Sequence, residues 1–192
     1  MAEVSFENRT VIVTGAGNGL GKAYAMEFAK RGANVVVNDI GGSVDGAGSE
    51  NAPADIVVEE IKSNGGTAVA NYDSVATKEG GQSIIDTALN EFGSIHSVVN
   101  NAGILRDKSF AKMEEEDFNA IIDVHLKGTF FVCQPAFIQM KEQGFGRFVN
   151  VSSPSGLFGN FGQLNYGAAK MGIVGLTNVL AIEGMKYNIK AN

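Results

Sequence analysis

Short apolar runs alternate along this chain with longer segments in which apolar residues recur every three or four positions. Four of the five short runs are rich in Val and Ile without polar alternation, which is typical of strands covered on both faces of a parallel sheet. The pattern predicts strands at Thr10–Thr14, Asn34–Asn38, Thr67–Ala70, Ile95–Val99 and Arg147–Val151.

The segments between these strands have the apolar spacing of helices. They are Leu20–Arg31, Ala54–Ser63, Gly80–Phe92, Glu114–Gln143 and Tyr166–Met185. Alternating strands and helices imply right-handed crossovers between parallel strands. We therefore expect an α/β fold: a Rossmann-type, doubly wound parallel sheet with helices on both faces.

Two segments interrupt this alternation. The glycine-rich segment Gly41–Ala52 predicts a loop after the second strand. The last residues, Asn188–Asn192, have the pattern of a further strand that has only begun. We therefore expect a single domain over residues 1–192 that is truncated near its sixth strand, with its C-terminal part missing.

Composition excludes several classes of protein. Hydrophobic residues make up 44% and charged residues 19%, which excludes a disordered chain. The net charge of −6 argues against a nucleic-acid partner, because duplex binding requires a basic face. A single cysteine, Cys133, indicates a reducing compartment. We see no apolar run near the ~20 residues of a membrane span and no signal peptide, so we expect a protein that is not secreted.

A glycine-rich turn follows the first strand at Thr14–Gly21, with the spacing T-G-x-x-x-G-x-G. Small residues there let the backbone approach a pyrophosphate, and the next helix directs its N-terminal N–H groups at the anion. The residues expected to bind a dinucleotide are Gly15, Asn18, Gly19, Leu20 and Gly21.

Asp39 ends the second strand, about 20 residues after the glycine turn, where an acid that binds the adenosine ribose is expected. A carboxylate at this position would repel a 2′-phosphate, and neither Asn18 nor Ile40 supplies a compensating cation. The sequence therefore favours NAD over NADP.

Three further motifs follow in order: Asn100-Asn101-Ala102-Gly103, Ser152-Ser153 and Tyr166-Gly-Ala-Ala-Lys170. Together with the glycine turn, this set resembles the short-chain dehydrogenase/reductase family over essentially the whole chain. A single Y-x-x-x-K is commonplace on helices, but four motifs in one order are specific. The resemblance implies an enzyme in which Ser153, Tyr166 and Lys170 are catalytic.

The chemistry of these side chains agrees with that role. Tyr166 and Lys170 are four positions apart on one helix, so they share a face. A free tyrosine has a pKa of about 10, and a neighbouring ammonium together with a positive nicotinamide ring lowers it. Tyr166 would then take the substrate hydroxyl proton while a hydride passes to the nicotinamide, with Ser153 hydrogen-bonded to the substrate oxygen.

The resemblance also assigns roles to other residues. Asn101 and the turn Asp73-Ser74-Val75 would contact the adenosine half of the cofactor, and Lys170 would also hold the nicotinamide ribose. The family's fourth catalytic residue is an asparagine in N-L-x-G, whereas this chain has His125 in Val124-His125-Leu126-Lys127-Gly128. We hypothesise that His125 holds the relay water near Lys170; a packing role is the alternative.

Longer segments narrow the choice within the family. They are VVVNDIGG, AVANYDSV, VVNNAGILRDKSF, DVHLKGTF and GLFGNFGQLNYGAAK. These resemble the (3R)-hydroxyacyl-CoA dehydrogenase branch found in peroxisomal multifunctional enzymes type 2, and His125 agrees with that branch. The implied reaction is NAD-dependent oxidation of a (3R)-3-hydroxyacyl-CoA to a 3-oxoacyl-CoA in fatty-acid β-oxidation, with steroids or other secondary alcohols as possible side substrates.

Two other functions stay open at this point. The first is a 3-oxoacyl-thioester, steroid or ketone reductase of the same family, against which Asp39 argues because cellular reductases mostly use NADPH. The second, of another class, is a non-catalytic NAD-binding fragment.

The sequence gives general expectations about the partners and the cellular compartment of the protein. Arg106, Lys108 and Lys112 are candidates to bind CoA phosphates. By analogy with the family we expect a homodimer through the segments that carry Phe130, Phe131, Phe137, Val174 and Leu180. We expect no metal, and a cytoplasmic location in a bacterium or a peroxisomal one in a eukaryote.

Overall fold

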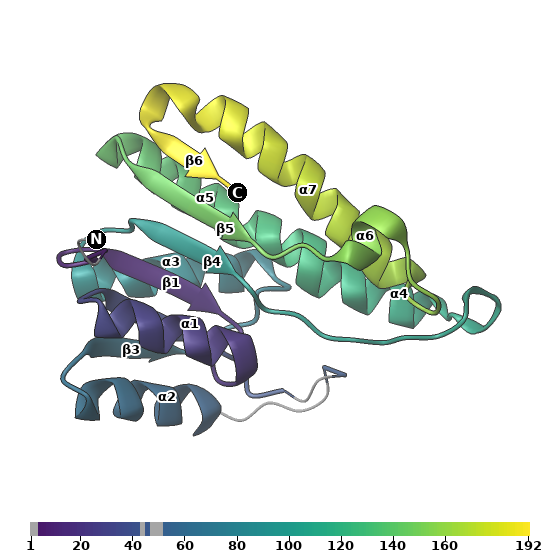
Figure 1. The fold of residues 1–192 in the computed structure, drawn as a ribbon, viewed down its shortest axis with the longest axis horizontal. Coiled ribbons are helices and arrows are strands. Elements are labelled where there is room, and N and C mark those ends of the chain that lie inside the picture. The colour runs from purple at the N-terminus through teal and green to yellow at the C-terminus, as the bar shows by residue number, and fades with distance from the viewer. Residues whose placement is uncertain (1–3, 43–44, 47–51) are drawn as a thin grey trace.

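Six parallel strands form the centre of the computed structural model, which describes residues 4–42, 45–46 and 52–192 (Figure 1). The strands are β1 (Thr10–Thr14), β2 (Asn34–Asn38), β3 (Thr67–Asn71), β4 (Ser97–Asn100), β5 (Gly146–Asn150) and β6 (Ile189–Ala191). Their order in the sheet is β3-β2-β1-β4-β5-β6. The change of direction between β1 and β4 makes the sheet doubly wound, which confirms the predicted fold class.

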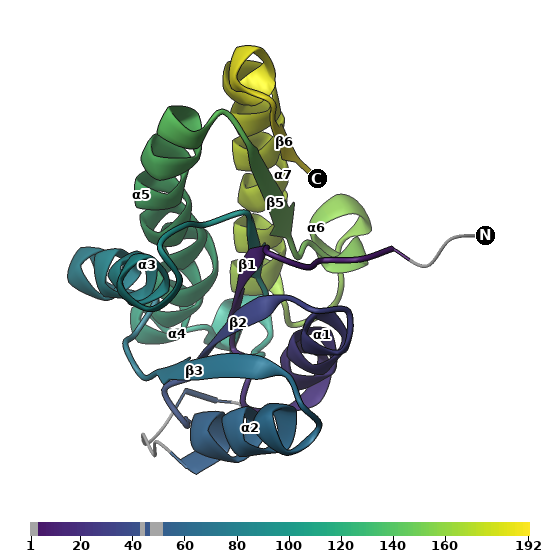
Figure 2. The ribbon, with the colours of Figure 1, turned by 90° about the vertical axis from the view of Figure 1, so that its left-hand side faces the viewer.

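Helices cover both faces of the sheet (Figure 2). They are α1 (Gly19–Lys30), α2 (Ala52–Ser63), α3 (Lys78–Phe92), α4 (Glu115–Ile121), α5 (Gly128–Gln143), α6 (Pro154–Phe158) and α7 (Leu164–Gly184). Helices α1 and α2 pack on one face, and α3, α5 and α7 pack on the other.

The apolar runs explain why both faces are covered. On β1, Val11 and Val13 are buried under α1 and α2, whereas Ile12 is buried in the core formed with α3 and α5. The neighbouring strand continues both layers, because Val11 pairs with Val35 and Ile12 with Val36. A strand that is apolar at every position thus supplies both cores at once.

Most differences from the sequence-based expectations lie at the ends of elements. The predicted long helix, however, is divided near its middle by a π-helical turn, Ile122–Lys127. Helix α6 was not predicted at all, although Ser153 followed by Pro154 is a typical helix start. Most of the predicted loop Gly41–Ala52 lies outside the described residues.

The continuous helical run Glu115–Gln143 is long and apolar enough to cross a membrane by length and composition. The sequence predicts no membrane span, and a single helix of this kind is weak evidence for one. The core helix of a compact domain passes the same test, and this run buries Val132, Cys133, Ala136 and Met140 against the sheet.

Candidate functional site

A cleft of about 560 Å³ opens at the carboxyl ends of β1, β2 and β4. In doubly wound sheets, ligands bind at this edge, where the strand order reverses. All ten residues predicted to bind the nucleotide, apart from those of the catalytic pair, line the cleft: Gly15, Asn18, Gly19, Leu20, Gly21, Asp39, Asp73, Ser74, Val75 and Asn101.

The glycine turn at the floor of the cleft is shaped by close backbone contacts. Gly15 and Gly19 have positive φ angles of 61° and 54°. A Cβ atom on Gly21 would lie 2.0 Å from the Gly15 carbonyl oxygen, so no larger residue fits there. Asn18, which precedes α1, makes no side-chain capping bond. The N-terminus of α1 is therefore suited to an anion in the cleft.

Asn101 supports this turn from the neighbouring strand. Its Nδ2 atom donates to the carbonyl oxygens of Thr14 (3.1 Å) and Gly15 (3.0 Å). In return, Thr14 Oγ1 accepts from the backbone N–H groups of Asn101 and Ala102. The Asn101 side chain thus fixes the turn, and the residue lines the cleft from this position.

Two of the three acidic residues that line the cleft, Asp39 and Asp73, are the ones predicted to bind the cofactor, and they are held differently. The Asp39 carboxylate accepts hydrogen bonds from the N–H groups of Gly17 and Gly41, each 2.7 Å long. The Asp73 carboxylate accepts from Asn71 (3.0 Å) and from Ser83 (2.7 Å). Each carboxylate has a fixed position, Asp39 at the end of β2 and Asp73 beside α3.

Tyr166 and Lys170 lie in the first two turns of α7. The Lys170 Nζ atom is 5.4 Å from the centre of the Tyr166 ring and donates to the Val151 carbonyl oxygen at 2.5 Å. Lys170 is only 3% exposed, and this burial lowers the pKa of its ammonium group from 10.5 to about 8. The structure therefore brings together the predicted pair, with a buried cation beside the phenol.

His125 joins the pair from the π-helical turn on the opposite helix. Its ring meets the Tyr166 ring edge-on, with centres 5.2 Å apart and an interplanar angle of 87°. Depending on the tautomer, Nε2 donates to the Ile104 carbonyl (2.8 Å) or accepts from the Ile104 N–H (3.1 Å). The other ring nitrogen, Nδ1, is buried without a hydrogen-bond partner in the described structure. Gly103 leaves room for the His125 ring, because a Cβ atom at position 103 would lie 2.4 Å from His125 Cε1.

His125 is neutral at physiological pH. Burial and, secondly, the charge of Lys170 lower its pKa from 6.5 to about 4. The group around Tyr166 therefore contains one cation, Lys170, and a neutral imidazole whose free nitrogen is aimed into the protein interior.

Ser153 caps α6, and its Oγ atom accepts from the Ser155 N–H at 3.2 Å. The short helix packs closely on the start of α7, where a Cβ atom on Gly156 would lie 2.8 Å from the Met171 nitrogen. Ser153 is thus placed on the segment that rests against the turns of α7 carrying the catalytic pair.

Sequence reasoning missed the support around Tyr166. The fully buried Asn165 donates to the carbonyl oxygens of Arg106 (3.0 Å) and Asp117 (3.1 Å), so it ties the start of α7 to two other segments. Asn165 directly precedes Tyr166 in the sequence, but this position does not indicate which distant backbone groups its side chain binds.

The basic residues predicted to bind CoA phosphates have other partners. Lys108 Nζ lies 2.7 Å from Asp117 Oδ2 and lowers the pKa of that carboxyl group. Arg106 lies 3.4 Å from Glu116. These ion pairs leave two members of the predicted patch already neutralised. Within residues 4–42, 45–46 and 52–192, no three His, Cys, Asp or Glu side chains are grouped so that they could hold a metal ion.

The short chain dehydrogenase family model matches residues 9–192, and the chain belongs to this family. Membership and the doubly wound fold imply a nicotinamide nucleotide cofactor and an oxidoreductase. The predicted resemblance is thus confirmed.

Two peroxisomal relatives are similar to the chain over nearly all of its length. The chain is 58% identical over 189 residues to the peroxisomal hydratase-dehydrogenase-epimerase of Saccharomyces cerevisiae, covering 98% of this chain and 21% of the relative. It is 57% identical over 187 residues to the mouse (Mus musculus) peroxisomal multifunctional enzyme type 2, covering 97% of this chain and 25% of the relative. The chain therefore spans about a fifth to a quarter of these relatives.

Two other matches bear on function and fold. A 3-oxoacyl-[acyl-carrier-protein] reductase of Synechocystis is 39% identical over 184 residues, covering 96% of this chain and 71% of the relative. The crystal structure of a short chain dehydrogenase from Mycobacterium avium superposes with a TM-score of 0.90 at 45% identity, covering 98% of this chain and 67% of that one.

The buried neutral His125 predicts a pH-dependent stability. Its pKa is about 4 in the folded protein and 6.5 in a free histidine, so the unfolded state binds more protons between these values. Stability from the neutral ring is present above pH 6.5 and is lost as the pH falls towards 4. Through this ring the wild type should lose about 3 kcal/mol of its free energy of unfolding between pH 6.5 and pH 4. We expect His125→Gln not to show this loss, as measured by urea unfolding at several pH values in that range.

His96 provides the control, because burial lowers its pKa too but its side chain is only half-buried. His96→Gln should reduce the pH dependence of the free energy of unfolding less than His125→Gln does. Equal slopes in the His125→Gln variant and the wild type would contradict the burial of a neutral ring.

Proposed function

We propose that this chain is an NAD-dependent dehydrogenase that oxidises (3R)-3-hydroxyacyl-CoA to 3-oxoacyl-CoA in fatty-acid β-oxidation. The observation that carries the proposal is the buried Lys170 ammonium beside Tyr166, in a fold that also has a glycine-lined cleft at the carboxyl ends of its strands. The similarity to peroxisomal multifunctional enzymes supports the choice of substrate.

The cleft fits a dinucleotide. The turn Gly15–Gly21 leaves room where side chains would clash, and the uncapped N-terminus of α1 attracts the pyrophosphate. Asp39 would hold the adenosine ribose, and Asp73, Ser74 and Val75 would border the adenine. When bound, the nicotinamide ring supplies the hydride acceptor.

Proton transfer is assigned to Tyr166. The Lys170 ammonium stabilises the phenolate form, so more of Tyr166 is available near neutral pH to accept the substrate hydroxyl proton. Ser153 would hydrogen-bond the substrate oxygen as it becomes a carbonyl. Lys170 would also bind the nicotinamide ribose, which places the ring beside the same phenol.

His125 is assigned the relay position. Its Nδ1 atom is buried without a hydrogen-bond partner in the described structure, and the charge of Lys170 acts on the ring. A water molecule bound to Nδ1 would carry a proton away from the catalytic group. The packing role is supported too, because Nε2 binds the Ile104 backbone. The His125→Gln variant separates the two roles: an unchanged rate and pH profile would leave packing alone.

The alternative, a 3-oxoacyl-thioester or ketone reductase, is favoured by the similarity to the Synechocystis enzyme. Asp39 argues against it, since its fixed carboxylate would face a 2′-phosphate of NADP. A non-catalytic NAD-binding fragment is the alternative of another class, and the assembled Tyr166, Lys170 and His125 argue against it.

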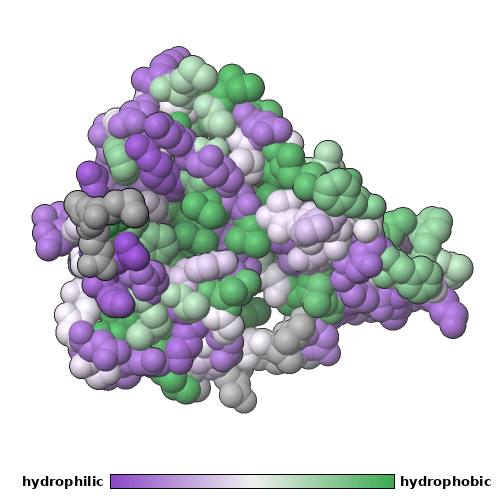
Figure 3. All heavy atoms as spheres, viewed as in Figure 1, coloured by the Kyte–Doolittle hydropathy of each residue, from purple (hydrophilic) through white to green (hydrophobic). Residues whose placement is uncertain are grey.

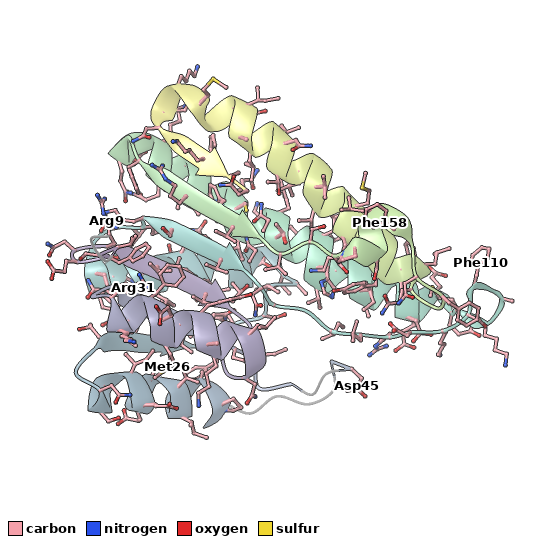
Figure 4. The ribbon with its side chains drawn as sticks, viewed as in Figure 1. Arg9, Met26, Arg31, Asp45, Phe110 and Phe158 are labelled. Atoms are coloured by element: carbon pink, nitrogen blue, oxygen red, sulfur yellow. The ribbon has the colours of Figure 1, made fainter. Side chains whose placement is uncertain are left out.

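Exposed apolar side chains agree with an apolar substrate and with a partner subunit. Phe110 and Phe158 are 75% and 86% exposed near the end of the molecule at which α7 begins, where an acyl chain could lie (Figure 4). Apolar residues also gather along α7 (Figure 3). Of the five residues expected at a dimer interface, Phe130 is exposed, whereas Phe137 and Leu180 pack against the core.

A homodimer through α5 and α7 remains part of the proposal on these grounds. Exposed residues of the two helices are Phe130, Ile138, Met171, Val179 and Ile182. A peroxisomal location in a eukaryote, or a cytoplasmic one in a bacterium, is proposed by similarity.

Tyr166→Phe tests the assigned chemistry. We expect kcat for oxidation of (3R)-3-hydroxybutyryl-CoA and longer (3R) homologues to fall by about 10²–10⁴-fold, because the base is lost. NAD⁺ affinity, measured by calorimetry, should be unchanged within a few-fold. Oxidation at the wild-type rate would contradict the assignment, and turnover of only the (3S) substrates would contradict the proposed stereochemistry.

Asp39→Ser tests the choice of cofactor and the reductase alternative. The wild type should have a higher kcat/KM with NAD⁺ than with NADP⁺. Removal of the carboxylate should lower the ratio of these two values by about tenfold or more. Steady-state kinetics with each cofactor provide the measurement. A wild-type preference for NADP⁺ would favour the reductase.

A further inference from the structure

Two pairs of neighbouring strands, one on each side of β1, end in asparagine. Asn38 pairs in register with Asn71 at the ends of β2 and β3, and Asn100 pairs with Asn150 at the ends of β4 and β5. All four side chains are buried. Buried amides require partners, and here each pair of strand ends forms a directional hydrogen-bond chain.

The chain on the catalytic side leads from the sheet to α7. Asn100 Nδ2 donates to Asn150 Oδ1 (2.8 Å), and Asn150 Nδ2 donates to Thr177 Oγ1 (2.9 Å). Thr177 Oγ1 in turn donates to the Ile173 carbonyl (2.8 Å). The second N–H of Asn100 reaches Cys133 Sγ at 3.1 Å, so the network is closed by α5.

Three successive residues at the end of β5 thus bind α7. Asn150 binds Thr177, the Val151 carbonyl accepts from Lys170 Nζ, and Ser152 Oγ donates to the Lys170 carbonyl oxygen (3.0 Å). Thr177 lies seven positions after Lys170, two turns along the same face of the helix. The Asn150–Thr177 bond therefore fixes the register of α7 on the strand that holds the Lys170 ammonium.

The other half of the sheet repeats the arrangement without a catalytic group. Asn38 Nδ2 donates to Asn71 Oδ1 (2.8 Å), Asn71 Nδ2 donates to Thr87 Oγ1 (3.0 Å), and Thr87 Oγ1 donates to the Ser83 carbonyl (2.9 Å). Here the chain ends on α3. This half provides a control, because its Asn–Asn–Thr bonds match those of the catalytic half and involve no lysine. It differs in that Asn71 Nδ2 also donates to Asp73 (3.0 Å).

We propose that Asn150 and Thr177 are positioning residues that hold Lys170 against the Val151 carbonyl and beside Tyr166. The inference rests on the proposed function in taking Tyr166 as the base. Without the Thr177 hydroxyl, Asn150 Nδ2 is left buried and unpaired, and α7 can move relative to β5. The attraction between ammonium and phenolate depends on their separation, so such movement leaves less of the phenol in the deprotonated form that accepts the proton.

Few titratable groups face Lys170 in the described part of the chain. Tyr166 faces it from its own helix and His125 from the π-helical turn. The segment after β5 presents the Val151 carbonyl to the ammonium and the Ser152 hydroxyl to the Lys170 backbone. His125 is neutral above pH 5 because burial lowers its pKa to about 4. A change in the pH profile near and above neutrality therefore reports on Tyr166 and Lys170.

The test compares Thr177→Val, Thr177→Ser and Thr87→Val in the full-length protein. Thr177→Val should raise the apparent pKa of the proton-accepting group in the kcat profile by about one unit, which lowers kcat about tenfold near neutrality and restores it at high pH. Thr177→Ser keeps the hydroxyl and should keep the wild-type profile. Thr87→Val should lower the urea midpoint as Thr177→Val does, but leave the profile in place.

A profile that Thr177→Val leaves unchanged, or that Thr87→Val shifts equally, would overturn the proposal. Should Thr177→Val fail to fold, Thr177→Cys replaces it, with a weaker acceptor and a shift of the same sign. If the wild type oxidises no hydroxyacyl-CoA, the proposed function fails, and NMR titration of ¹³C-labelled Lys170 decides the positioning role alone. Its pKa, about 8 in the wild type, should rise towards 10.5 in Thr177→Val only.

Discussion

The contact between the Lys170 ammonium and the Val151 carbonyl is the constraint on which the site depends. A buried cation is costly unless it is hydrogen-bonded, and here the partner is the backbone oxygen of the residue that follows β5, a strand paired on both sides. The strand end is fixed by the sheet, so the position of the charge follows from the position of β5. Tyr166, one turn earlier on α7, is placed by the same packing. The chemistry of the phenol is thus tied to the geometry of the sheet.

The same logic extends across the carboxyl edge of the sheet. Asn101 holds the glycine turn by its side chain, while its neighbour Asn100 joins β4 to β5. The cofactor cleft and the catalytic pair are therefore connected through adjacent residues of one strand. His125 completes the arrangement as a neutral ring between the Ile104 backbone and Tyr166. A protonated ring beside Lys170 would repel it, so burial of His125 in its neutral form supports the cation.

Much of this could be predicted from sequence because it depends on local patterns. Apolar runs such as Thr10–Thr14 predict buried parallel strands, and glycine spacing predicts the turn. The side chains that line the cleft follow strand ends, which topology brings together. Contacts made across the fold could not be predicted in this way. Three examples are the π-helical turn around His125, the ion pair between Lys108 and Asp117, and the Asn150–Thr177 bond. They depend on the directions of side chains in the folded protein, which the spacing of residues along the sequence does not specify.

Proton transfer at Tyr166 depends, in this arrangement, on the Lys170 ammonium beside the phenol. The rate of hydride transfer in Lys170→Met, followed as NADH absorbance in a single turnover at saturating NAD⁺, tests this dependence most directly. We predict a rate lower than that of the wild type by about tenfold or more, because the cation beside the phenol is removed. Hydride transfer at the wild-type rate in Lys170→Met would contradict it.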